Sequence, residues 1–587
     1  MLSACAMLVA CGDDDESTDF WGSYGSSDSS DDEEQTDVSD IDFDTSFLDE
    51  GTEEIPSDDN DYVENSTFNY TLEVVYSEVG AEISGDTEMV DVEVDGGHVV
   101  VTSETKGMAY VLSGECSDGS FKIYSDYKMK LTLNGLTLTN PEGAAINDQC
   151  GKSMYVVLAD GTENTLTDGS SYTIPDDEDM KGTFFSEGQL LFSGAGTLNV
   201  NANYKNGIVS DDYIVFRPGN VINVRSSGTN GVKANDGVTV RGGVLNVGVT
   251  AAGSKGINSE ANVLIEGGRT TLITTGGTTI EDNDTKSCAG VKADSAFTMT
   301  AGELYIKSSG SGGKGINADT EVTIDGGTIE IVTTGKSYSS GRNYSASPKG
   351  IKADGNLTIN DGDITVSTTG GDGAEGIESK STMTINGGNI VVTAYDDALN
   401  ASKSIVIAGG QVYAYSTGND AIDSNGSLYF SGGTIIGLGA SSVEGPFDCD
   451  QGTFAITGGN IIGMGGAIST PTTSATKQPV VVLGSQSYSS GTYLALNDSG
   501  GDNIFSFKVP VKYSQSVLVL SSPEMSVGSS YTIKSGVSVS GGTWWQGFSD
   551  DASVSGGSTL KTLSLSSMVT TSGTTSTTMP GGGMGWR

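Results

Sequence analysis

Hydrophobic and polar residues alternate along much of this 587-residue chain in short runs that glycines separate. The pattern is clearest at 349–370, where Ile351 and Ala353 alternate with Lys352 and Asp354. Such alternation places apolar side chains on one face of an extended strand and charged side chains on the other. Two further runs in the same stretch alternate in this way, so the stretch predicts three short β-strands.

This three-strand pattern repeats from about residue 206 to residue 462. Successive copies begin mostly 22 to 26 residues apart, and two begin 34 and 35 residues after the preceding copy. Glycine pairs such as Gly326-Gly327 separate the second and third runs, as expected of corners that need a positive φ. The period predicts an all-β fold, a right-handed parallel β-helix with three short strands per coil and coils about 4.8 Å apart. The two long steps predict loops at 276–288 and 335–348 that leave one edge of the solenoid.

Composition changes along the chain and indicates five segments. They are 1–62, a lipoprotein signal remnant and disordered acidic tether; 63–175, an N-terminal β region with the first irregular coils; 176–470, the parallel β-helix; 471–569, a small antiparallel β cap; and 570–587, a disordered tail. The cap is expected to cover the open edge of the last coil, because a bare strand edge invites aggregation.

Charge is distributed unevenly along the chain. The formal net charge is −47, and residues 1–62 contain 21 acidic residues and no Lys or Arg. Residues 203–380 are nearly balanced, with 16 Lys and Arg against 20 Asp and Glu. The overall acidity disfavours nucleic acid as a partner. The single histidine disfavours histidine-based catalysis and a histidine-rich metal site.

The first residues carry a possible anchor signal. Leu8-Val9-Ala10-Cys11 resembles a bacterial lipoprotein cleavage site, and the acidic stretch 12–16 resembles the surface-export signals of some Gram-negative lipoproteins. The basic part of a secretory signal is missing, so we expect the true start to lie upstream. The pattern predicts lipidation of Cys11 and a cell-surface lipoprotein of the outer membrane, attached through the lipid alone. The alternative is a chance match in a short apolar end.

The motif Leu-Ala-Asp-Gly-Thr-Glu-Asn-Thr-Leu-Thr-Asp-Gly at 158–169 precedes the glycine-rich coils. With these coils and the C-terminal β unit, residues 64–540 resemble the bacterial carbohydrate-binding domain-containing β-helix family, formerly a domain of unknown function, whose fold is similar to that of pectate lyases. The resemblance implies calcium binding and affinity for acidic plant polysaccharides such as polygalacturonate, without established catalysis. Copies in the family often open with Asp. Here the opening residue becomes acidic only from Glu375, which weakens the expectation of calcium in the early coils.

Stacking the copies places residues one repeat apart in outward columns, and lysines recur in two columns of the early coils. The predicted ligand-binding row is Lys233, Lys255, Lys292, Lys314, Lys349 and Lys352. A row of ammonium groups suits the carboxylates of an extended polyanion. The alternative is that these lysines only neutralise the acids beside them, because like charges on adjacent strands are unfavourable.

The later coils gather acids instead. The predicted metal ligands are Glu375, Glu378, Asp396, Asp397, Asp420, Asp423, Asp448 and Asp450. Carboxylates this close raise one another's pKa unless a cation lies among them, and Ca²⁺ takes six to eight oxygen ligands. The sequence therefore predicts one or more Ca²⁺ ions here, and the alternative is a solvated acidic face.

Three functions remain open from the sequence. The preferred one is a non-catalytic, surface-anchored and calcium-dependent binder of acidic polysaccharide, which is expected to be a monomer. The second is a β-helix polysaccharide lyase, which needs Ca²⁺ beside a Lys or Arg base. Lys380 and Lys403 are the only such bases within the acidic cluster, which disfavours catalysis. The third is an adhesin or structural spacer that presents the two long loops.

Overall fold

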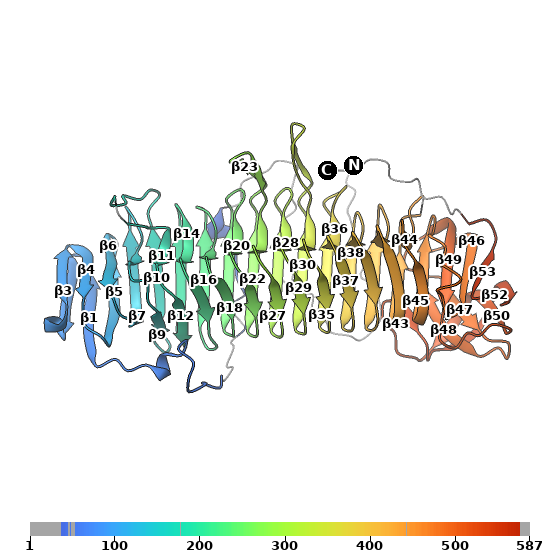
Figure 1. Cartoon of the computed structure of the whole chain (residues 1–587), viewed down its shortest axis with the longest axis horizontal. Coiled ribbons are helices and arrows are strands. Elements are labelled where there is room, and N and C mark those ends of the chain that lie inside the picture. Colours follow the sequence, from blue (N-terminus) through green and yellow to red (C-terminus); the bar gives the residue numbers. More distant parts are fainter. Residues whose placement is uncertain (1–36, 45–46, 48–52, 177, 442, 576–587) are drawn as a thin grey trace. The chain divides into compact units, whose positions relative to one another are not determined.

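The computed structural model describes residues 37–44, 47, 53–176, 178–441 and 443–575, and Figure 1 shows their strands. They divide into two compact units, one within 33–383 and one within 384–587. Each unit contains coils of a right-handed parallel β-helix, which confirms the predicted fold class. Cys11 and its neighbours lie outside the described residues. Among the described residues, no helix is long and apolar enough to cross a membrane.

Each coil of the first unit contributes one strand to each of three parallel ladders. The first ladder contains β4 (Gly97–Ser103), β6 (Gly119–Ser125), β8 (Ile146–Asp148), β11 (Gly182–Ser186), β14 (Asn206–Ser210), β17 (Val232–Ala234), β20 (Lys255–Ser259), β25 (Ala289–Ala293), β28 (Lys314–Ala318), β33 (Lys349–Ala353) and β36 (Glu375–Ser379). The second contains β9 (Met154–Leu158), β12 (Leu190–Gly194), β15 (Tyr213–Phe216), β18 (Gly237–Val240), β21 (Val263–Ile265), β26 (Phe297–Met299), β29 (Val322–Ile324) and β34 (Leu357–Ile359). The third contains β10 (Glu163–Asp168), β13 (Thr197–Ala202), β16 (Val221–Ser226), β19 (Val244–Val249), β22 (Arg269–Thr274), β27 (Glu303–Ser308), β30 (Thr328–Thr333) and β35 (Asp363–Thr368).

The core of the unit is the thin space that the three ladders enclose. Ile351, Ala353, Leu357 and Ile359 of one coil are each 0% exposed, as their alternation with polar residues predicted. Burial of such side chains stabilises each by about 1.5–3 kcal/mol, so every coil needs its neighbours to exclude water.

The solenoid begins earlier than the sequence indicated. Near its start, β1 (Tyr70–Ser77) with β2 (Gly80–Gly85), and β3 (Asp91–Asp95) with β4, form antiparallel pairs. Parallel pairing is already present where β5 (Met108–Cys116) meets β1 and β7 (Met129–Asn140). The stretch 63–175 is therefore part of the same stack. The described residues of this unit also include three short 3₁₀ helices, η2 (Val38–Asp40), η3 (Val63–Asn65) and η4 (Thr87–Met89).

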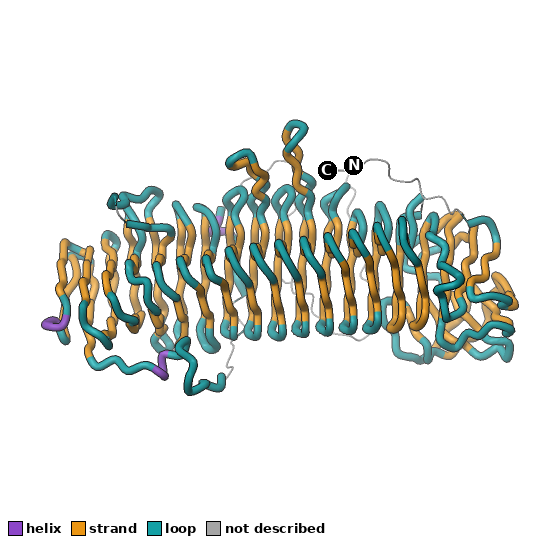
Figure 2. Tube along the Cα trace, in the orientation of Figure 1, coloured by secondary structure: helices purple, strands orange, loops and turns teal. Residues whose placement is uncertain are grey.

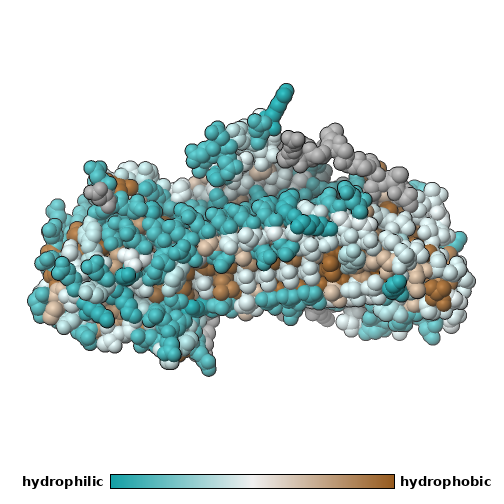
Figure 3. Space-filling view, viewed as in Figure 1, coloured by the Kyte–Doolittle hydropathy of each residue, from teal (hydrophilic) through white to brown (hydrophobic). Residues whose placement is uncertain are grey.

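The two predicted loops are β-hairpins that project from the same edge of the first unit (Figure 2). One consists of β23 (Thr279–Glu281) and β24 (Asp284–Lys286), and the other of β31 (Tyr338–Ser340) and β32 (Tyr344–Ala346). Both hairpins carry mainly hydrophilic residues on the face seen in Figure 3.

The second unit continues the three-strand pattern and then changes to antiparallel strands. β37 (Thr382–Ile385) spans the boundary, and the coils contain β38 (Asn389–Ala394), β39 (Leu399–Ala401), β40 (Ser404–Ile407), β41 (Gln411–Ser416), β42 (Ile422–Ser424), β43 (Ser427–Leu438), β44 (Phe447–Cys449) and β45 (Phe454–Gly465). The cap contains β46 (Val480–Tyr488), β47 (Tyr493–Asn497), β48 (Asn503–Lys508), β49 (Tyr513–Ser521), β50 (Ser530–Ser540), β51 (Phe548–Ser549), β52 (Ser553–Ser564) and β53 (Val569–Ser572). β49 pairs antiparallel with β45 and so covers the edge of the last coil.

The end of the chain departs from the predicted disordered tail at 570–587. β53 pairs in parallel with β46, so residues 570–572 belong to a sheet. Residues 576–587 lie outside the described residues.

Candidate functional site

The first ladder brings all six predicted lysines onto its strands. One column contains Lys255, Ala289, Lys314, Lys349 and Glu375, and a second contains Lys233, Asn258, Lys292, Asn317, Lys352 and Glu378. This register is the one that stacking the repeats predicted. We call the six lysines the lysine face. Their role in ligand binding stays a prediction.

Four lysines of this face are neutralised by neighbouring acids. The ion pairs are Lys233 Nζ–Glu260 Oε1 (2.9 Å), Lys292 Nζ–Asp294 Oδ1 (2.6 Å), Lys292 Nζ–Asp319 Oδ1 (2.7 Å), Lys349 Nζ–Glu375 Oε2 (2.8 Å) and Lys352–Asp354. The contacts of these four lysines are those expected if the lysines only neutralise the acids beside them, which was the alternative to ligand binding.

Lys255 and Lys314 differ from the other four. Their ammonium groups donate to the carbonyl oxygens of Gly253 (2.6 Å) and Gly312 (3.3 Å). Neither forms an ion pair with any described residue. Burial, together with the charges of Lys352 and Lys349, lowers the pKa of Lys314 to about 8. Burial also lowers the pKa of Lys255. An anion at these two positions would therefore meet partly desolvated ammonium groups that no carboxylate yet neutralises.

Two of the predicted metal ligands have lysine partners instead. Glu375 pairs with Lys349, and Glu378, whose side chain is 2% exposed, pairs with Lys380 and lies 3.8 Å from Lys349 Nζ. Burial disfavours ionisation of Glu378, but the charges of Lys349 and Lys380 outweigh it and lower its pKa. The negative charge of this pair is thus compensated by the protein itself.

The second unit holds three buried acids, Asp397, Asp420 and Asp448, which are 5%, 5% and 8% exposed. We call them the aspartate row. Asp397 accepts from the Asp420 amide (3.2 Å), and Asp420 accepts from the Gly445 amide (2.6 Å). Burial, with the charges of Asp397 and Asp448, raises the pKa of Asp420 to about 9. This carboxyl is therefore protonated at neutral pH unless a cation joins it.

The remaining predicted ligands lie around this row. Asp396 accepts from Asn419 Nδ2 (2.6 Å), Asp423 accepts from Asn400 Nδ2 (3.3 Å), and burial raises the pKa of Asp450. Within the described ranges, no group of three His, Cys, Asp or Glu side chains is arranged to hold one metal ion. These side chains do not by themselves form a complete calcium site, and calcium binding stays a prediction.

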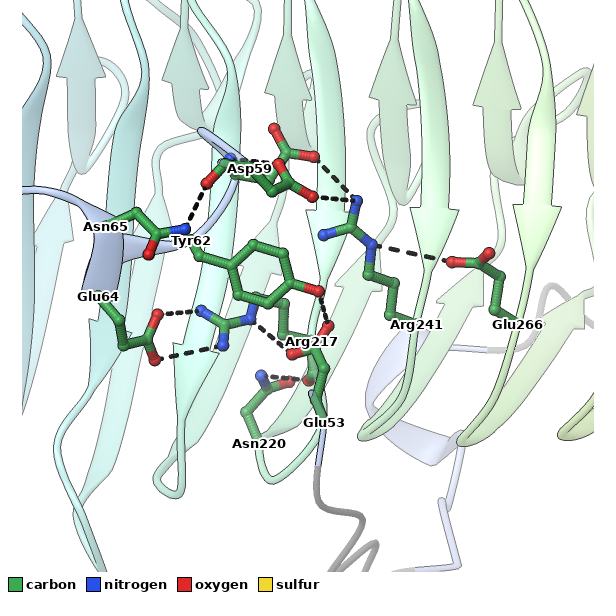
Figure 4. Close-up of polar contacts among 10 residues, drawn as sticks. Glu53, Asp59, Tyr62, Glu64, Asn65, Arg217, Asn220, Arg241 and Glu266 are labelled. Atoms are coloured by element: carbon green, nitrogen blue, oxygen red, sulfur yellow. Dashed lines mark hydrogen bonds and ion pairs between the residues drawn. The ribbon is translucent and has the colours of Figure 1, made fainter. Parts of the chain in front are cut away.

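Sequence reasoning missed a second cationic surface, the arginine strip, which consists of Arg217, Arg225, Arg241 and Arg269. The acidic strap, meaning the described residues among 37–64, lies against this strip. Figure 4 shows the later part of the strap beside Arg217 and Arg241. Tyr62 and Ile41 of the strap are each only 4% exposed. The predicted disordered tether is thus wrong for these residues, because guanidinium groups on the coils bind their carboxylates. The signal was present in the sequence, where an acidic segment precedes coils that hold most of the basic residues.

Two known proteins are similar to parts of this chain. A carbohydrate-binding domain-containing protein of Acetivibrio thermocellus is 33% identical over 138 residues, which are 22% of this chain and 48% of the relative. The chain thus spans about half the length of that relative. A solved structure described as a polysaccharide lyase-like protein from C. thermocellum, gadolinium derivative, is 22% identical. The match covers 52% of this chain and 99% of the solved chain, with a TM-score of 0.33.

The family match extends over most of the solenoid and the cap. The family described as carbohydrate-binding domain-containing protein matches residues 95–253, 308–373 and 368–558, together more than half of the chain. The protein belongs to the carbohydrate-binding domain-containing family.

Proposed function

We propose that this protein binds acidic polysaccharide without transforming it, and that the lysine face is the contact surface. The observation that supports this most directly is the column Lys255–Ala289–Lys314, in which two lysines have no acidic partner among the described residues. The two are separated by one coil, so they repeat along the stack at about 9.6 Å. A linear polyuronate such as polygalacturonate presents carboxylates along its length and can meet both.

Partial burial makes this contact stronger than an ion pair on an open surface. An exposed pair contributes only about 0.2–1 kcal/mol, whereas a pair in a lower effective dielectric interacts more strongly. Lys314 already bears the cost of desolvation, which its lowered pKa reports. A uronate carboxylate beside it would offset that cost and favour the charged amine.

The test is retardation in native gels that contain polygalacturonate, with a neutral polysaccharide gel as reference. The wild-type protein should be retarded, and Lys255→Gln with Lys314→Gln should weaken retardation at least about fivefold, which is about 1 kcal/mol. Lys292→Gln is the matched control, because Lys292 already pairs with Asp294 and Asp319 and its loss should have a smaller effect. Equal retardation of wild type and double variant would remove the lysine face from the proposal.

Calcium dependence is the finer part of the proposal, and we restrict it to the aspartate row. This row fits a cation in one respect, since Asp420 is buried beside the like charges of Asp397 and Asp448, which raise its pKa, and no ion pair joins it to a described Lys or Arg. Bound calcium would supply that charge, while water or glycan oxygens would complete its ligands. Glu375 and Glu378 are left out because lysines already compensate them.

A lyase needs a neutral base, and this requirement disfavours Lys380. Its ammonium group pairs with Glu378, and although burial opposes charge, Glu378 raises its pKa. A base held in its protonated form cannot abstract a proton efficiently near neutral pH. Lys380 is thus a poor candidate base, and this supports our proposal of binding rather than cleavage. New ultraviolet absorbance from unsaturated uronate on mixing with polygalacturonate would restore the lyase alternative.

We further propose that Cys11 is lipidated and that the protein acts at the cell surface of a Gram-negative bacterium. The acidic residues after Cys11 support this location. Labelling with an alkynyl fatty acid should mark the wild-type chain expressed behind a bacterial lipoprotein leader and should not mark Cys11→Ser expressed in the same way.

A further inference from the structure

The acidic strap contacts the arginine strip through carboxylates that bind the guanidinium groups and through aromatic rings that lie beside them. Arg217, whose side chain is 7% exposed, donates through Nε to Glu53 Oε2 (2.8 Å). It also forms a two-pronged contact with Glu64, at 2.9 Å through Nη1 and 3.2 Å through Nη2. Figure 4 shows the Tyr62 ring beside this guanidinium, and the ring centroid is 4.3 Å from it.

The next coil repeats the arrangement with Arg241. Its Nη2 donates to Asp61 Oδ2 (3.0 Å), and the same Tyr62 ring lies 5.3 Å away. Asp61 also accepts from the Tyr213 hydroxyl (2.6 Å). Asp59 lies 3.8 Å from the same Nη2 of Arg241, so the strap places one aromatic ring and acids from four positions over two neighbouring coils.

The first part of the strap engages the other two arginines. Arg225 lies 4.5 Å from the Phe43 ring and donates to the Ile41 carbonyl (3.1 Å). Arg269 lies 4.0 Å from the Phe47 ring and pairs with Asp44 (3.2 Å). Each arginine of the strip therefore contacts a strap ring, and three of the four also contact a strap carboxylate.

The coils compensate this strip only in part. Glu303 pairs with Arg269 (2.7 Å), and Glu266 lies 3.8 Å from Arg241. Both acids on Arg217 come from the strap. Displacement of the strap would therefore expose guanidinium groups that the described coils leave without a full complement of acids.

We propose that the arginine strip is a second site for acidic polysaccharide, which the acidic strap occupies and from which the polymer competes to displace it. The strap indicates the chemistry of the ligand, because carboxylates and aromatic rings alternate along it. A polyuronate has the same two features, a carboxylate on each sugar and an apolar ring face. Guanidinium groups bind both, by paired hydrogen bonds and by stacking. This inference rests on the proposed function. It adds a site on the third ladder and at the ends of second-ladder strands, away from the lysine face on the first ladder.

The test uses the full chain and three variants in polygalacturonate gels. Glu53→Gln, Asp61→Asn and Glu64→Gln together form the strap variant, which removes the competing charge and keeps side-chain shape. The strap variant should be retarded at least about fivefold more strongly than wild type. Adding Arg217→Gln and Arg241→Gln should abolish this gain. Adding Lys255→Gln and Lys314→Gln instead should leave the gain in place.

Hydrogen exchange distinguishes a strap that the polymer displaces from a strap with a structural role alone. Only a displaced strap should lose protection when polymer is added. Saturating polygalacturonate should lower protection of residues 53–64 in the wild-type protein, because the polymer replaces the strap. Equal retardation of wild type and strap variant, unchanged protection of 53–64, or a gain that survives loss of both arginines would each overturn the inference. If the wild type is retarded through Lys255 and Lys314 but the strap variant shows no gain, only this inference fails. If neither chain is retarded, the proposed function fails as well.

Discussion

At the scale of single residues, the environment of each charge decides what it can do. Lys314 and Lys292 occupy neighbouring coils of the same ladder, yet Lys292 lies between two aspartates and Lys314 donates only to a carbonyl. The first is compensated, and the second retains a charge whose pKa burial has lowered to about 8. Chemical type alone does not distinguish them.

The lowered pKa of Lys314 predicts how polysaccharide binding depends on pH. The amine is mostly charged at about pH 7 and mostly neutral at about pH 9, so retardation by polygalacturonate should weaken as pH rises through about 8. Retardation of Lys314→Gln should change less between these two pH values, since the variant lacks the titrating amine. A wild-type response that Lys314→Gln reproduces in full would assign the pH dependence to other groups.

The raised pKa of Asp420 predicts how the stability of the folded protein depends on pH. Its pKa is about 9 in the folded protein against an ordinary value of 3.8, so between these values the folded state holds a proton that the unfolded state releases. Stability should therefore fall as pH rises from about 5 to about 9. Asp420→Asn keeps an oxygen for the Gly445 amide and removes the titration, so its melting temperature should fall less over that range.

Added calcium should also distinguish the wild-type protein from Asp420→Asn. Millimolar Ca²⁺ at about pH 8.5 should raise the melting temperature of the EDTA-treated wild-type protein, because the ion compensates the ionised row. Asp420→Asn should respond weakly. No shift in the wild type would count against calcium at the aspartate row.

At the scale of elements, glycine corners allow the coils to stack. Gly268 has φ +68°, and a Cβ there would lie 2.4 Å from the Gly243 carbonyl oxygen of the preceding coil. A side chain would thus both strain the backbone and separate two coils. The repeated Gly-Gly in the sequence is a packing requirement as well as a turn signal.

Gly268→Ala should therefore destabilise the first unit by about 3 kcal/mol or more in urea unfolding, from strain and from steric conflict. Gly135→Ala is the matched control, since Gly135 has φ +74° with no atom within 4 Å of the added Cβ. It should cost only about 1–2 kcal/mol, the penalty for the left-handed conformation. Equal losses would show that contact between coils contributes little at this corner.

At the scale of the whole molecule, a strongly acidic chain presents two surfaces that carry lysine or arginine side chains, and these are where we propose that an acidic polymer binds. The formal charge of −47 would repel a polyanion, but it is concentrated partly in the N-terminal segment that holds 21 acids. In the first unit, described residues of that segment are bound to the arginine strip. The proposed binding of an acidic glycan would therefore depend on local charge compensation rather than on net charge, and retardation by polygalacturonate should weaken with added salt.

The sequence by itself determined the fold and the columns of this protein. Ladder hydrogen bonds join residues one repeat apart, so counting along the repeat places Lys314 opposite Lys349 and Asp423 opposite Asp448. Alternation of apolar and polar residues also identified the buried face of each strand. These features are periodic and local, and sequence reasoning reaches them directly.

Only the tertiary structure decided which charges remain without partners and where the acidic segment lies. Arg217 and Glu53 are 164 positions apart, and no period relates them. Lys349 faces Glu375 in the next coil, so a predicted ligand-binding residue and a predicted metal ligand neutralise each other. Such pairings depend on how side chains from different coils, or from outside the repeat, meet in space, and a repeating pattern along the chain does not contain that information.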